Sequence, residues 1–107
     1  MKKEIIDKII NYEGEGDYIA LATVVSATGS SPRDIGTQML VYPNGSIEGT
    51  VGGGISEAET IEQAEELMQT GKNKKCSFDM SNEEVAKVGG VCGGQVEIFI
   101  ETIKVDD

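Results

Sequence analysis

The spacing of hydrophobic and polar residues divides the chain into segments of helical and strand character. Residues 2–12 place isoleucines at helical spacing between charged residues, which predicts one amphipathic helix. These isoleucines are Ile5, Ile6, Ile9 and Ile10. Residues 18–27 are apolar and β-branched, which is typical of a largely buried strand. Residues 96–103 alternate apolar and polar side chains and predict a final strand with one face on the core.

Turn and capping signals organise the middle of the chain. Asn44-Gly45 separates two β-type runs, residues 37–42 and 46–51, and predicts an antiparallel hairpin. The S-x-x-E pattern of residues 56–59 is typical of a capping box, and the helix that it predicts ends at Gly71.

Two further elements precede the final strand. Residues 74–79 predict a short strand with Cys76 and Phe78 on one face. Residues 81–84 form a second capping box, and the short helix that they predict stops at Gly89-Gly90.

The order of these elements predicts an α/β (α+β) fold in one domain over residues 1–107. We expect a mixed β-sheet of about four to six strands, including the Asn-Gly hairpin, packed against two to three helices.

Charge and composition narrow the classes of partner. The formal net charge of -10 repels nucleic acid and anionic membranes, so neither is expected to bind. No apolar run reaches about 18 residues, which favours a cytoplasmic protein with Cys76 and Cys92 as free thiols. The chain has no histidine, which excludes Ser-His and Cys-His nucleophile pairs and histidine-ligated zinc, and no metal site is predicted.

Three glycine-bearing segments stand apart from this scaffold: residues 29–33, 52–54 and 89–94. Gly52, Gly53 and Gly54 directly precede a predicted helix start. A glycine run at that position either forms a strand-to-helix turn or lets an anionic ligand approach several backbone N–H groups at the positive end of the helix dipole. The sequence alone leaves both interpretations open.

The other two segments carry polar and thiol chemistry. Ser30, Ser31 and Arg33 offer hydroxyl and guanidinium donors that suit a phosphate or carboxylate, although a surface turn with Arg33 in an ion pair explains them equally well. Cys92 lies between two glycine pairs, where it is either a reactive thiol or an inert small side chain. Gln38, Thr50 and Glu57 lie near these segments and are secondary candidates.

Four stretches of the chain occur in an order and spacing that is specific to one family. They are VVSATGSSPRDIGTQMLV at 24–41, GSIEGTVGGGISEAE at 45–59, FDMSNEE at 78–84 and VCGGQVEIFIE at 91–101. Over nearly its whole length the chain resembles the N-terminal domain of the XdhC/CoxI family of xanthine dehydrogenase accessory factors.

This resemblance implies a role in the maturation of molybdenum hydroxylases. Family members bind molybdenum cofactor (molybdopterin) as cargo, support exchange of an oxo ligand for a sulfido ligand, and hand the product to the hydroxylase apoenzyme. They act as chaperones more than as turnover enzymes. The contacts implied by motif are Ser30, Ser31, Arg33, Gly52, Gly53, Gly54, Glu57 and Cys92.

Cys92 is also the candidate catalytic thiol, which would carry a persulfide received from a cysteine desulfurase. A different function stays open beside the cargo chaperone. In that alternative the chain is a non-catalytic interaction module that docks a hydroxylase or a sulfurtransferase without binding cofactor.

Two departures from the family pattern affect these expectations. Many members have a cysteine after the third glycine, where this chain has Ile55, so Cys92 lacks a second thiol unless Cys76 or another subunit supplies it. Full-length members add a C-terminal Rossmann-type domain that these residues do not contain. We therefore expect a stand-alone first half that acts with a separately encoded Rossmann-type partner or as a homodimer.

Overall fold

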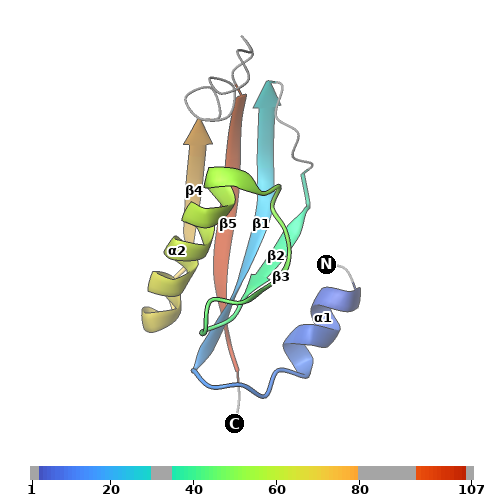
Figure 1. Cartoon of the computed structure of the whole chain (residues 1–107), viewed down its shortest axis with the longest axis vertical. Coiled ribbons are helices and arrows are strands. Elements are labelled where there is room, and N and C mark those ends of the chain that lie inside the picture. Colours follow the sequence, from blue (N-terminus) through green and yellow to red (C-terminus); the bar gives the residue numbers. More distant parts are fainter. Residues whose placement is uncertain (1–2, 30–34, 80–93, 106–107) are drawn as a thin grey trace.

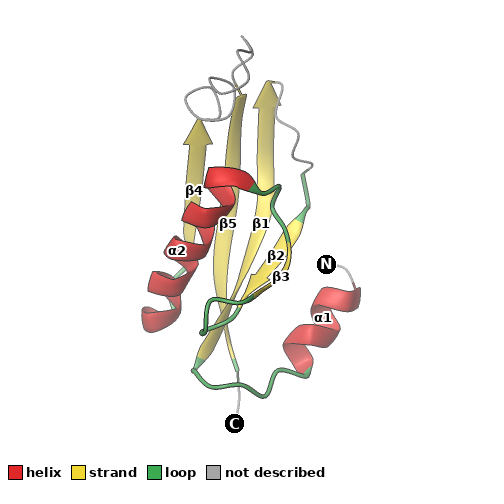
Figure 2. Ribbon diagram, in the orientation of Figure 1, coloured by secondary structure: helices red, strands yellow, loops and turns green. Residues whose placement is uncertain are grey.

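A five-stranded β-sheet forms the centre of the structure, with one helix packed against each of its faces (Figures 1 and 2). The computed structural model describes residues 3–29, 35–79 and 94–105. The elements in chain order are α1 (Lys3–Ile10), β1 (Tyr18–Gly29), β2 (Gln38–Val41), β3 (Ile47–Gly49), α2 (Gly54–Thr70), β4 (Lys74–Asp79) and β5 (Gly94–Lys104).

The strands lie in the order β3-β2-β1-β5-β4, and each described pairing is antiparallel. The helix α2 connects β3 to β4, which run in the same direction but lie at opposite edges of the sheet. β5 enters between β1 and β4 and runs antiparallel to both. The predicted α+β class, strand number and two helices are confirmed, whereas the sheet is antiparallel at these pairings and not mixed, because β5 separates the strands that share a direction.

The two helices cover opposite faces of the sheet. Successive side chains of a strand point to opposite faces, and in β1 this alternation sends Ala20 and Ala22 towards α2 while Ile19 and Leu21 pack with α1. The α2-side cluster also holds fully buried side chains of neighbouring strands: Met39, Val41, Val96, Ile98 and Ile100. Burying one such aliphatic side chain contributes about 1.5–3 kcal/mol, so this cluster is the main source of stability.

The α1 helix uses only part of its apolar surface against the sheet. Ile5 is buried and Ile9 is half-buried, but Ile6 is 39% exposed and Ile10 is 72% exposed. The helix itself was predicted correctly, while its isoleucine spacing did not show which side chains meet the sheet.

Local turn chemistry confirms two predicted features, the Asn-Gly hairpin and the end of α2. Between β2 and β3 the Asn44 side-chain oxygen accepts hydrogen bonds from the Ser46 backbone N–H (3.0 Å) and hydroxyl (2.7 Å), which fixes the predicted hairpin. Gly71 ends α2 in a left-handed conformation, and its N–H donates to the Leu67 carbonyl at 2.8 Å. The helix predicted after residue 81 lies outside the described residues. Within the described ranges, neither helix has the length and apolar character needed to cross a membrane.

Cys76 belongs to the core and not to an accessible site. It lies on β4 beside Phe78, and each is 8% exposed within the α2-side cluster, as their alternation predicted. Burial raises the pKa of the Cys76 thiol, an effect that Lys74 opposes and Glu59 reinforces. The group therefore stays a neutral thiol, which is a poor nucleophile.

We expect Cys76 to be protected from thiol reagents in the folded protein. In a Cys92→Ser variant, where Cys76 is the one thiol of the sequence, reaction with dithionitrobenzoate should be on the order of a hundredfold slower than in urea-unfolded protein, because the sulfur must first be exposed by opening of the fold. Equal rates in the folded and unfolded states would contradict this burial.

Candidate functional site

The strands that flank two of the predicted glycine-bearing segments come together at one end of the sheet. β1 ends at Gly29, which lies opposite Gly94 at the start of β5, and Asp79 at the end of β4 lies opposite Gln95. The described residues that flank segments 30–34 and 80–93, namely Gly29, Asp79 and Gly94, therefore lie at one end of the sheet on neighbouring strands. The helix α2 also starts towards this end, as Figure 1 shows.

Half of the predicted site residues belong to those two segments. Ser30, Ser31, Arg33 and Cys92 lie outside the described residues, and their roles stay predictions. The remaining four, Gly52, Gly53, Gly54 and Glu57, lie in and just after the loop between β3 and α2.

The glycine run is required by the backbone conformation of this loop. Gly52, Gly53 and Gly54 have φ angles of 121°, 76° and 75°, a region that side chains with a Cβ rarely adopt. A Cβ added at Gly53 would meet nothing within 4 Å, so the space above that residue is open. The turn interpretation thus accounts for the three glycines, and the open space is compatible with a ligand approaching Gly53.

The N–H groups of the loop converge on a carboxylate of the protein itself. One oxygen of Glu57 (Oε1) accepts hydrogen bonds from the backbone N–H groups of Val51 at 3.2 Å and Gly53 at 3.1 Å. The Thr50 hydroxyl donates to the same oxygen and accepts a hydrogen bond from the Gly52 N–H at 3.0 Å. Glu57 therefore fills the position that a bound anion would take at this helix start.

This arrangement corrects the predicted start of α2. The helix begins at Gly54, and its N-cap residue Gly53 has no side chain that could accept a capping hydrogen bond. Ser56, the predicted capping residue, is fully buried in the first turn, where its carbonyl accepts a hydrogen bond from the Thr60 hydroxyl at 2.7 Å. The Glu57 carboxylate accepts a hydrogen bond from the N–H of the N-cap residue Gly53, which resembles the contact that the acidic residue of a capping box makes. The glycine run permits this earlier start, which the serine pattern could not reveal.

The secondary candidate Gln38 has a structural role. Its side-chain amide donates to the Thr23 hydroxyl at 3.2 Å across the β1–β2 pairing. In the part of the chain that the structure describes, no group of three or more Asp, Glu or Cys residues is arranged to hold a metal ion.

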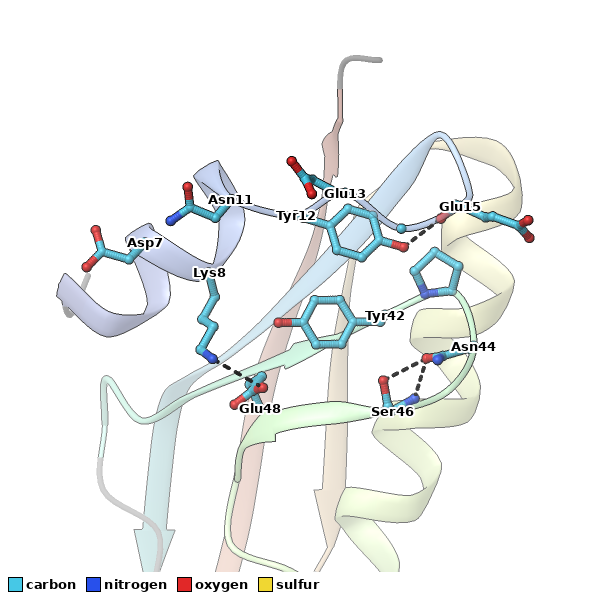
Figure 3. Close-up of a pocket in the computed structure, with 12 residues that line it drawn as sticks. Asp7, Lys8, Asn11, Tyr12, Glu13, Glu15, Tyr42, Asn44, Ser46 and Glu48 are labelled. Atoms are coloured by element: carbon cyan, nitrogen blue, oxygen red, sulfur yellow. Dashed lines mark hydrogen bonds and ion pairs between the residues drawn. The ribbon is translucent and has the colours of Figure 1, made fainter.

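A cavity that sequence reasoning missed lies away from the glycine loop. It has a volume of about 840 Å³ and is formed by α1, the loop that follows it, and the β2–β3 turn (Figure 3). None of the predicted site residues lines it. Its walls come from residues 7–15 and 42–48, which are far apart in the sequence, so no local pattern predicted that they would share a site.

Replacing Gly53 tests the loop conformation. We expect Gly53→Ala to lower the free energy of unfolding by about 1–2 kcal/mol, because alanine is strained at positive φ. Gly49→Ala provides the comparison. Gly49 also has positive φ (84°), but its Cβ would lie 2.7 Å from the Gln38 carbonyl oxygen, so the loss should be larger. Urea denaturation measures both, and a neutral Gly53→Ala variant would show that the loop adopts another conformation.

Replacing Glu57 tests the internal carboxylate contact. Glu57→Ala should destabilise the protein by about 1–3 kcal/mol, because the Val51 and Gly53 N–H groups lose this acceptor. Glu57→Gln should cost less, since its amide oxygen accepts the same hydrogen bonds. Glu62→Ala, at an exposed position of the same helix, is the control and should change stability by less than about 0.5 kcal/mol. Equal effects at positions 57 and 62 would refute the contact.

Comparison with known proteins extends over most of the chain. The XdhC and CoxI family matches residues 14–79. Uncharacterized protein YqeB of Escherichia coli (strain K12) is 40% identical over 81 residues, which cover 76% of this chain and 15% of YqeB. The crystal structure of a xanthine dehydrogenase from Bacillus halodurans shares the fold with a TM-score of 0.78 at 23% identity. That similarity covers 95% of this chain and 30% of the Bacillus chain.

The chain therefore spans only a small part of the length of these relatives. The family match nevertheless includes the hairpin, the glycine loop and all of α2. Because this match extends over more than half of the sequence, the chain belongs to the XdhC and CoxI family.

Proposed function

We propose that this protein acts in the maturation of a molybdenum hydroxylase of the xanthine dehydrogenase type, as a chaperone that binds molybdenum cofactor as cargo. Family membership over residues 14–79 is the observation that carries the proposal. The solved neighbour with the same fold is named as a xanthine dehydrogenase, which agrees with an association with that class of enzyme.

One feature of the glycine loop favours an anionic cargo. Its N–H groups and the Thr50 hydroxyl are already oriented towards a single anionic oxygen, that of Glu57. A phosphate of the cargo would meet these donors only by displacing Glu57, because two anions cannot share the cluster without strong repulsion. We therefore assign the first contact with the cargo phosphate to Ser30, Ser31 and Arg33, whose segment begins beside the start of β5.

Cys92 is the thiol that we propose for the sulfur chemistry. Its segment ends at β5, whose first residue is paired with the residue that precedes Ser30. Cys76 does not supply a second thiol there, because its side chain is buried in the α2-side core. Any persulfide on Cys92 would come from a cysteine desulfurase, and the partner that receives the cargo would be the hydroxylase apoenzyme.

One observation favours a second candidate function. The Val51 and Gly53 N–H groups of the glycine loop have an internal acceptor in Glu57, so these donors need no ligand as an acceptor. This agrees with an interaction module that docks a hydroxylase or a sulfurtransferase and binds no cofactor.

Cargo binding separates these candidates. Purified protein incubated with molybdopterin should retain it through gel filtration, and Arg33→Ala should retain at least about tenfold less, because an arginine–phosphate contact is charge-assisted and bidentate. Lys72→Ala removes an equal charge from an exposed position after α2 and should bind like the wild type.

No retention by the wild-type protein would refute the cargo proposal. Capture of a hydroxylase that survives both Cys92→Ser and Arg33→Ala would then favour the interaction module. Arg33→Ala is a cleaner test than a change at Gly53, because the positive φ of Gly53 makes any substitution there affect stability as well.

A further inference from the structure

The cavity beside α1 has an aromatic wall. The rings of Tyr12 and Tyr42 stack with centroids 5.3 Å apart and planes 9° from parallel. Tyr12 is held in place by a hydrogen bond from its hydroxyl to the Glu15 carbonyl at 2.6 Å. Figure 3 shows the two rings one above the other, between the loop after α1 and the β2–β3 turn. The volume of about 840 Å³ lies within the range of about 300–1,000 Å³ found for ligand sites.

The rim of this cavity is acidic. Four carboxylates contribute to its lining, those of Asp7, Glu13, Glu15 and Glu48, against the single ammonium group of Lys8. Lys8 already pairs with Glu48 at 3.7 Å, which leaves the other three without a cation among the residues that line the cavity. In Figure 3 these carboxylates point outward at separate places around the rim and do not converge on one point. That arrangement suits several positive charges on one long ligand better than a single small cation.

An apolar patch adjoins the acidic rim. Ile6 and Ile10 are one helical turn apart on α1 and are 39% and 72% exposed. Asp7, which lines the cavity, lies three residues before Ile10 and is therefore its neighbour on the helix surface. Of the large apolar side chains that the structure describes, only Val25 and Ile35 are comparably exposed. An exposed apolar pair beside charged groups is typical of a protein contact and not of a site for a small ion.

We propose that α1 and the adjoining cavity form a docking surface for a basic, amphipathic segment of a partner protein. Its apolar side would cover Ile6 and Ile10, and its lysine or arginine side chains would reach the rim carboxylates and the tyrosine pair. This surface involves none of the residues assigned to the cargo.

The test uses two fluorescein-labelled peptides of equal charge. One is a 14-residue peptide of leucine and lysine with an amphipathic helical pattern, and the other replaces each leucine by serine. Fluorescence anisotropy at 0.15 M salt should show binding of the first peptide and much weaker binding of the second. Glu13→Gln combined with Glu15→Gln should weaken binding of the first about fivefold to tenfold, because two exposed charge pairs are lost. Ile10→Ser should weaken it by a similar factor.

Matched variants separate this surface from the overall negative charge. Glu62→Gln combined with Glu66→Gln makes the same charge change on exposed positions of α2, and Ile35→Ser removes an isoleucine that is 68% exposed. Both should bind the peptide like the wild type. Equal weakening by the matched variants, equal binding of the serine peptide, or no binding to the wild type would each overturn the proposal. It would also be overturned if Ile10→Ser converted a dimer to a monomer without changing peptide affinity, since the patch would then bind a second copy of the chain.

Discussion

The pairing of β5 with both of its neighbours is the interaction on which the sheet depends. β5 lies between β1 and β4, and within the described sheet β4 pairs with no other strand. Its side chains Val96, Ile98 and Ile100 are fully buried beneath α2. Without β5 the core would lose these side chains, and β1 and β4 would each expose an unpaired edge, which favours aggregation. The last strand of the chain therefore completes a core that the earlier strands leave open.

The same pairing determines which loops become neighbours. Because β5 is antiparallel to β1 and β4, its first residues lie beside the last residues of both strands, at Gly29 and Asp79. The segment that carries Arg33 thus starts at the same end of the sheet at which the segment that carries Cys92 starts and finishes, although more than fifty residues separate these two side chains in the sequence. The acidic cavity depends on a different constraint, the packing of α1 against the opposite face, where Ile5 joins Leu21 and Leu40. The cavity beside α1 and the end of the sheet at Gly29 and Asp79 are therefore built on separate parts of the scaffold.

Local signals predicted the helices and strands well, whereas features that depend on contacts between distant residues could not be predicted. Asn44-Gly45 and Gly71 act within a few residues, so the hairpin and the end of α2 followed directly from the sequence. The direction of pairing did not, because it depends on where β5 inserts after the chain has crossed the sheet. The predicted start of α2 was wrong because the S-x-x-E pattern at Ser56 does not reveal that the glycines before it let the helix begin earlier.

The hydrogen-bond acceptor of the glycine loop is a second feature that the sequence could not identify. The sequence left open whether the glycine run forms a turn or admits an anionic ligand. The N–H groups of Val51 and Gly53 donate to a carboxylate oxygen of the protein itself, and contact with a ligand stays a prediction. That oxygen belongs to Glu57, which the sequence placed near the loop without showing its orientation. The α1 isoleucines give a parallel case, because helical spacing alone does not distinguish the pair that meets the sheet from the pair that faces solvent.

The Glu57 carboxylate also restricts how any anionic cargo can be held. Two unit charges about 4 Å apart repel by about 1 kcal/mol in water and by about 4 kcal/mol at an effective dielectric constant near 20. The net charge of -10 adds a field of the same sign. A phosphate beside an undisturbed Glu57 therefore needs a cation, and Arg33 is the one arginine in the sequence. If the proposed cargo binds, the loop and Glu57 would shape the wall of the site while Arg33 provides the attraction.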